Sequence, residues 1–319
     1  MAPLSKKRVV AIGGGTGNFT VLRGIKNHFE NVTAVVSMSD EGGSTGLLRE
    51  EFGILPPGDV RRALIALAAT DPSTLSELFS YRFDRGSSLS GHVFGNLMIA
   101  ALERITGNFE KAVEEVGKIL RIQGRVLPVT LKPTYLVTWL DDGRVIRGEM
   151  ALHAQKPEEW TAVKKIWLEP PVPINPKATK AILQADCVII SPGDLYSDTI
   201  PNLIVEGMRE VLKKTKATVV YFVNITTSHG ESTGFSAADF VATIESYLGK
   251  GIINYVVVNK TRPSLARLKP YLDENAGFVE PDVDRLGSKP TPIITDLVRA
   301  NGLVRHDPEK IAKVVKMLV

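Results

Sequence analysis

The chain has 319 residues, of which 44% are hydrophobic and 23% are charged. This composition excludes an intrinsically disordered chain and is sufficient for one large or two modest globular domains. The formal net charge of +4 is small and scattered along the chain, which argues against a nucleic-acid partner. The one cysteine, Cys187, excludes a disulfide within the chain. No apolar run reaches membrane length, so we expect a cytoplasmic protein without a membrane partner.

A glycine-rich segment follows the first predicted strand. The apolar run at 9–12 leads directly into Gly13-Gly14-Gly15-Thr16-Gly17-Asn18 and then into a helical pattern. Glycines after a buried strand let the backbone approach an anion, and the next helix directs its free N–H groups toward the same place. The segment therefore predicts a phosphate-binding loop. Asn18 replaces the third glycine of the dinucleotide fingerprint, so a tight turn without a ligand is the alternative.

A second glycine-rich segment follows the second predicted strand. Residues 32–38 are mostly apolar and β-branched, and they are followed by Ser39, Asp40 and Glu41 and then by Gly42, Gly43 and Ser44. In a βαβ unit both strands end at the same edge of the sheet, so the two carboxylates face the first glycine loop. Such a pair predicts a Mg²⁺ site, or hydrogen bonds to ribose hydroxyls.

Helical and strand-like segments alternate along the rest of the chain. The helical ranges are 19–29, 60–69, 95–105, 109–120, 176–184, 200–213, 237–248 and 308–318, and further strands are expected at 187–191, 218–224 and 253–259. This alternation predicts an α/β fold with a doubly wound, mostly parallel, Rossmann-like sheet. Residues 125–170 break the pattern and predict an antiparallel, hairpin-rich insertion. We expect a single domain over residues 1–319 that contains this insertion.

Several polar loops fall where a doubly wound sheet places ligands. Gly58, Asp59 and Arg61 precede or open a helix, with Asp59 as the expected N-cap. The neighbouring arginines oppose the helix dipole and so suggest a nearby anion. The segments 191–198 and 224–231 each follow a buried strand. His92 could act as a general acid or base, or it could support neighbouring site residues or cap the helix that follows. The histidines and the cysteine do not have the spacing of zinc ligands.

The C-terminal segment is the last candidate. Asp307 is the expected N-cap of the terminal helix and Pro308 its first residue. Arg305 has no such structural role. Its planar guanidinium suits a phosphate, or else a surface ion pair with a carboxylate.

Together these segments resemble the gluconeogenesis factor (YvcK-type) branch of the 2-phospho-L-lactate transferase (CofD-like) superfamily. The shared motifs are Gly-Gly-Gly-Thr-Gly at 13–17, Asp40 to Arg49, Pro56-Pro57-Gly58-Asp59-x-Arg61, Ser90-Gly91-His92-x-x-Gly95-Asn96-Leu97, Pro192-Gly193-x-Leu195-Tyr196, Pro201-Asn202-Leu203, Gly230-Glu231 and Arg305-His306-Asp307-Pro308. The resemblance covers nearly the whole chain. It implies a cytoplasmic protein that binds UDP-sugars, notably UDP-N-acetylglucosamine, and supports cell shape and wall synthesis during gluconeogenic growth.

Two other functions are compatible with these residues. The transferase branch of the superfamily moves phospholactate from a nucleoside-diphosphate carrier with Mg²⁺, and its metal-site aspartate resembles Asp40. A phosphotransferase would rely on Asp40, Glu41 and Arg61. An NAD-dependent dehydrogenase is disfavoured by Asn18 and by the glycines after Asp40. No residue is assigned a catalytic role, and the oligomeric state stays open, with a homo-oligomer as one option.

The sequence also departs from the family pattern, at Glu41, Arg62, Asp194, Asp198 and 226–232. These departures affect which base or sugar is preferred more than the class of ligand. The complete set of expected ligand-binding residues is Gly13, Gly14, Gly15, Thr16, Asn18, Asp40, Gly42, Gly43, Ser44, Gly58, Asp59, Arg61, His92, Asn96, Gly193, Tyr196, Asn224, Thr227, Glu231 and Arg305. Asp40 and Glu41 are the expected Mg²⁺ ligands, and no other cofactor is expected.

Overall fold

The computed structural model describes residues 4–69, 74–84, 86, 89–155 and 160–319. Its main element is a seven-stranded parallel sheet with the strand order β10-β9-β8-β7-β1-β2-β3. These strands are β1 (Ser5–Gly13), β2 (Phe29–Val36), β3 (Arg125–Pro128), β7 (Cys187–Ile190), β8 (Thr218–Phe222), β9 (Tyr255–Asn259) and β10 (Thr291–Thr295). The α/β, parallel-sheet prediction is confirmed.

The centre of the sheet is apolar on both faces. Val9, Val10, Ala11 and Ile12 of β1 are at most 2% exposed, and all four residues of β7 are fully buried. Strands covered on both faces have continuous apolar runs, which is why these segments are recognisable in the sequence. The strand order reverses between β1 and β7, and ligands of such sheets bind outside the carboxyl ends of the strands at this point.

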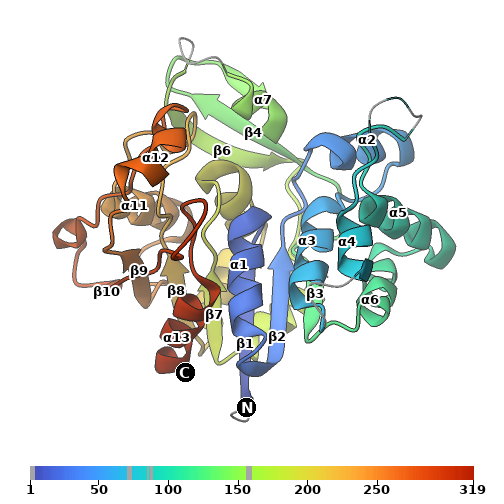
Figure 1. Ribbon diagram of the computed structural model, residues 1–319, viewed down its shortest axis with the longest axis horizontal. Helices are drawn as coiled ribbons and strands as arrows, with labels where there is room; N and C mark the ends of the chain where they lie inside the picture. The colour runs from blue at the N-terminus through green and yellow to red at the C-terminus, as the bar shows by residue number, and fades with distance from the viewer. Residues whose placement is uncertain (1–3, 70–73, 85, 87–88, 156–159) are drawn as a thin grey trace.

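Helices cover both faces of the sheet. In front of the strands in Figure 1, α1 packs between α13 and α3. The helices are α1 (Gly15–Ile25), α2 (Gly43–Phe52), α3 (Gly58–Leu67), α4 (Thr74–Ser80), α5 (Phe94–Thr106), α6 (Phe109–Ile119), α7 (Glu149–His153), α8 (Pro176–Leu183), α9 (Ile200–Leu203), α10 (Met208–Lys214), α11 (Ala237–Leu248), α12 (Leu265–Leu272) and α13 (Pro308–Leu318), with a π-helical turn η2 (Leu195–Thr199) and a 3₁₀ turn η3 (Val283–Arg285). No helix in the described ranges is long and apolar enough to cross a membrane.

The predicted insertion is a separate antiparallel sheet. Its strands β4 (Tyr135–Leu140), β5 (Val145–Arg147) and β6 (Val163–Glu169) are ordered β5-β4-β6, and the helix α7 follows β5. This small sheet lies above the carboxyl edge of the main sheet, at the top of Figure 1. Arg125–Pro128 fell within the predicted insertion but belongs to the main sheet, because it pairs in parallel with β2.

Two predicted helices have different bounds in the structure. The helix expected at 19–29 begins earlier, at Gly15, and ends at Ile25, since β2 already starts at Phe29. The helix expected at 200–213 is divided into α9 and α10. Between them lies Gly207 with φ of +92°, a left-handed conformation that interrupts a right-handed helix.

Candidate functional site

The glycine loop after β1 meets two carboxylates from distant parts of the chain. The N–H of Gly15 donates a hydrogen bond of 2.9 Å to Asp59 Oδ1. A Cβ atom on Gly14 would collide with Asp59 Oδ2, and one on Gly15 would collide with Asp198 Oδ2. The backbone of the glycine loop therefore approaches acidic side chains of α3 and η2 so closely that a Cβ would fit only if those side chains shifted. Asp59 is not the N-cap of α3, which is Pro57, since its carboxylate is directed to the glycine loop instead.

Asn18 holds the glycine loop to the neighbouring strand. Its Nδ2 donates to Gly13 O at 2.9 Å, and Ser191 Oγ donates to its Oδ1 at 3.0 Å. The side chain is 2% exposed. Because the two amide atoms bond to the last residue of β1 and to the residue directly after β7, this side chain fixes the distance between the two loops at the reversal of strand order.

The second glycine-rich segment starts α2 and forms a polar network with α3 and α5. Ser44 Oγ accepts hydrogen bonds from the Val93 N–H and from Asn96 Nδ2, at 3.1 and 3.3 Å. Arg61 Nε donates to Asn96 Oδ1 at 2.9 Å, and burial lowers the pKa of Arg61 to about 10. His92 is buried beside this network, and its Nδ1 has no hydrogen-bond partner among the described residues.

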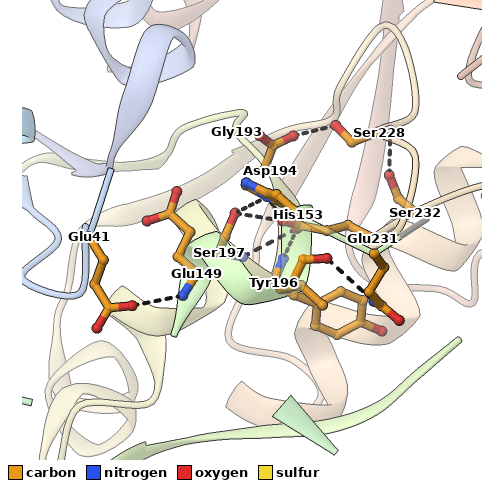
Figure 2. Close-up of polar contacts among 12 residues, drawn as sticks. Glu41, Glu149, His153, Gly193, Asp194, Tyr196, Ser197, Ser228, Glu231 and Ser232 are labelled. Atoms are coloured by element: carbon orange, nitrogen blue, oxygen red, sulfur yellow. Dashed lines mark hydrogen bonds and ion pairs between the residues drawn. The ribbon is translucent and has the colours of Figure 1, made fainter. Parts of the chain in front are cut away.

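Asp40 and Glu41 are directed to different neighbours. Asp40 Oδ1 accepts the Gly42 N–H at 2.8 Å, and its Oδ2 lies beside Gly58 and Thr45 Oγ1. Glu41 Oε2 accepts the N–H of Glu149 at 3.2 Å (Figure 2), and its Oε1 is 3.8 Å from Arg49 Nη1. Asp40 thus retains a carboxylate oxygen next to a hydroxyl, a donor set that suits Mg²⁺, whereas Glu41 anchors the start of α7.

The loops after β7 and β8 are joined by reciprocal hydrogen bonds. The Gly193 N–H donates to Asn224 Oδ1 at 3.2 Å, and Asn224 Nδ2 donates to Gly193 O at 2.7 Å. Thr227 exchanges hydrogen bonds with Gly277, from its N–H to the carbonyl and from the Gly277 N–H to its Oγ1, both at 2.8 Å. These contacts fix the two loops beside the glycine loop.

Glu231 is the most heavily hydrogen-bonded carboxylate of the site. Its Oε2 accepts the N–H groups of Tyr196 and Ser197 at 2.7 and 3.2 Å, and its Oε1 accepts Ser197 Oγ at 2.6 Å. His153 Nε2, from α7, lies 2.7 Å from the same Oε1 (Figure 2). Glu231 therefore stabilises η2 and links the insertion to the main sheet.

A cavity of about 420 Å³ lies between these loops. It is lined by Gly15, Thr16, Gly17, Thr20, Arg62, Glu149, Pro192, Gly193, Asp194, Asp198, Asn224, Ile225, Thr226, Ser228, Tyr271, Val304, Arg305 and His306. Five of the residues expected from the sequence are in this lining, namely Gly15, Thr16, Gly193, Asn224 and Arg305. Others support the loops from behind: Asn18, Asp59 and Tyr196 are buried and do not line the cavity.

Three departures from the family pattern, Arg62, Asp194 and Asp198, line the cavity as well. Sequence reasoning missed Glu149 and Tyr271. Glu149 lies in α7, a short helix of the insertion, for which the sequence predicted only strands. Tyr271 lies in α12, a helix that the sequence did not predict. Neither residue had a recognisable motif around it.

Acidic groups dominate the electrostatics of the cavity. Burial, reinforced by repulsion from Asp40, raises the pKa of Glu149 to about 8 and that of Asp59 to about 6. Burial and neighbouring carboxylates also raise the pKa of Asp194 and, strongly, that of Asp198. The pKa of His153 rises to about 9 because of its hydrogen bond to Glu231. The carboxyl groups crowd one another, and carboxyl groups with perturbed pKa values are typical of functional sites.

The fold and the cavity define a parallel α/β protein with a candidate ligand site at the reversal of strand order. Residues 9–298 match the family model described as 2-phospho-L-lactate transferase CofD, and the chain belongs to this CofD family.

Relatives that match nearly the whole chain show which branch of the family it resembles. A relative from Aquifex aeolicus is 40% identical, covering 98% of this chain and 96% of its own. One from Bacillus subtilis, named gluconeogenesis factor, is 37% identical and covers 97% of both chains. A crystal structure of a UPF0052 family member from Bacillus halodurans superposes with a TM-score of 0.92 at 35% identity, covering 98% of this chain and all of the other. The resemblance to the gluconeogenesis factor branch is confirmed.

Proposed function

We propose that this chain is a cytoplasmic protein that binds a nucleotide sugar, a UDP-sugar such as UDP-N-acetylglucosamine, in the 420 Å³ cavity. In this proposal it regulates cell shape and wall synthesis during gluconeogenic growth rather than catalysing a reaction. The observation that carries the proposal is the position of the cavity, at the reversal of strand order and against the glycine loop.

The cavity lining has groups suited to each part of such a ligand. Arg62 and Arg305 supply guanidinium groups for the diphosphate, and the first turn of α1 adds the backbone N–H groups of Thr16 and Gly17. Arg305 forms no ion pair or side-chain hydrogen bond with any described residue, so its guanidinium is available. Asn224 and Ser228 offer polar atoms for a base or a sugar.

The acidic side chains make Mg²⁺ an expected partner of the ligand. A diphosphate at the glycine loop would lie near the carboxyl groups of Asp59 and Asp198, and repulsion from their ionised forms would weaken binding. Bound Mg²⁺ would neutralise part of this charge. Asp40 would hold it, with the Thr45 hydroxyl as a neighbouring oxygen donor.

A Mg²⁺-dependent transferase that acts on a nucleoside-diphosphate-linked donor is the second candidate. A further cavity of about 660 Å³ favours it, because it shares Thr16, Thr20, Arg305 and His306 with the first cavity. Two adjoining cavities could hold a donor and an acceptor. Arg305 lies between them, where it could stabilise charge on a transferring phosphoryl group.

A ligand panel separates these proposals. Thermal unfolding is measured with UDP-sugars, GDP-linked compounds and NAD, each with and without Mg²⁺. A ligand at 100 times its Kd stabilises the protein by about 2.7 kcal/mol, so the ligand class is read from the shift in Tm. A shift with UDP-sugars but not with NAD supports the first proposal. No shift with any nucleotide sugar contradicts it, and turnover of a bound donor would favour the transferase.

A further inference from the structure

The insertion brings a histidine to two carboxylates of the main sheet. A ring nitrogen of His153, a carboxylate oxygen of Asp194 and a carboxylate oxygen of Glu231 all lie within 4.8 Å of one another. His153 comes from α7, Asp194 from the loop after β7 and Glu231 from the loop after β8, and 78 residues separate His153 from Glu231. Figure 2 shows the three side chains meeting from these separate elements.

Both carboxylates are held in place by hydrogen bonds from neighbouring groups. Glu231 is held by Tyr196 N–H, Ser197 N–H and Ser197 Oγ, and Ser228 Oγ donates to Asp194 Oδ1. Hydrogen bonds of this kind orient carboxylate ligands in protein metal sites. The cluster is thus organised before any ion arrives.

A second observation comes from the carboxylates around the cluster. Glu149 and Asp198 line the same cavity as Asp194, and no described residue donates a hydrogen bond to, or forms an ion pair with, either side chain. Carboxyl groups withdrawn from bulk water are normally satisfied by donors or paired with cations. Neither group has such a partner among the described residues, and a cation bound at the cluster would favour the ionised form of both.

We propose that His153, Asp194 and Glu231 bind a divalent transition-metal ion, separate from any Mg²⁺ at Asp40. An imidazole nitrogen with two carboxylates favours first-row transition metals and zinc over Mg²⁺, which prefers oxygen ligands and retains its waters. The ligand atoms of a four-coordinate ion are about 3.4 Å apart, given metal–ligand bonds of about 2.1 Å. Rotation of the partly exposed His153 ring would open its 2.7 Å contact with Glu231 to that separation. Asp194 lines the cavity, so an ion at this cluster would lie at the edge of the ligand site.

Cobalt is a suitable probe, because Co²⁺ bound through nitrogen gives visible absorption bands. The full chain, freed of metal, is titrated with Co²⁺ and with Zn²⁺ by absorption and calorimetry, in the presence of excess Mg²⁺. We expect one ion per chain. His153→Ala and Asp194→Asn should each weaken binding at least about tenfold, since changes even in the groups that support ligands cost that much.

A matched control comes from the surface. His28 Nε2 lies 2.9 Å from Glu309 Oε2, the same type of pair with no third ligand atom among the described residues. His28→Ala should leave the Co²⁺ affinity within about twofold of wild type. Wild-type protein that binds neither Co²⁺ nor Zn²⁺, or binding that survives both site variants, would overturn the proposal. If His153→Ala does not fold, Asp194→Asn alone decides, because it keeps the size of the side chain and its acceptor for Ser228.

Discussion

The carboxylate of Asp59 accepts a hydrogen bond from the Gly15 N–H at 2.9 Å, although 44 residues separate the two in the sequence. The contact closes the glycine loop against α3 and places a buried acid beside the expected phosphate position. The loop is therefore stabilised by the protein's own carboxylate in a place where many related loops bind an anion.

Asp59→Asn should increase stability at neutral and alkaline pH. Burial and Asp40 raise the pKa of Asp59 from 3.8 to about 6, so its contribution to stability is present below pH 3.8 and is lost as the pH rises through 6. Asparagine keeps an acceptor for Gly15 without the charge. Denaturant unfolding at pH 4 and pH 8 measures the effect, and Asp284→Asn, at an exposed site, is the control. A variant less stable than wild type at pH 8 would refute this.

Gly15→Ala should cost more stability than the same change at Gly53. Both glycines have left-handed φ values, +60° and +66°, for which an alanine costs about 1–2 kcal/mol. Only at Gly15 does the added Cβ meet another group, Asp198 Oδ2, whereas nothing lies within 4 Å at Gly53. Denaturant titrations compare the two variants, and adding Asp198→Ala should remove the excess. Equal costs at both positions would contradict the close approach of Asp198.

Arg305→Ala should lose about 1.5–3 kcal/mol of nucleotide-sugar affinity, the range for a hydrogen bond to a charged group, or roughly 10- to 150-fold in Kd. Stability without ligand should hardly change, since Arg305 has no ion-pair partner among the described residues. Calorimetric titration measures the affinity, with Lys316→Ala on the exposed side of α13 as the control. An affinity within threefold of wild type would contradict the prediction and would mean that the Arg305 side chain does not contact the ligand.

Asp40→Asn should remove the part of ligand affinity that depends on Mg²⁺. The change keeps the acceptor for the Gly42 N–H and deletes the charge that would hold the ion. Titrations with Mg²⁺ and with EDTA test this. The variant should match wild type measured in EDTA. A loss of affinity that persists in EDTA would instead point to a direct hydrogen bond between Asp40 and the ligand.

The sequence by itself determined the class of fold and the edge of the sheet at which the candidate site lies. Strands β1 and β7 are covered on both faces, so their residues must be continuously apolar, and glycines must follow β1 where Asp59 and Asp198 approach. Such local requirements can be read from neighbouring residues. The N-cap role of Asp307 was predicted correctly for the same reason, because its carboxylate accepts N–H groups only two and three residues further on.

Tertiary structure alone decided which side chains face the cavity. Asp59 was expected to cap its own helix, but it bonds to Gly15, and Asn18 joins β1 to β7 instead of lining the cavity. The triad of His153, Asp194 and Glu231 has no spacing that identifies it, since its members come from three loops or helices. A contact between distant segments depends on how the strands are ordered and how the insertion folds over them, and no short stretch of sequence specifies either.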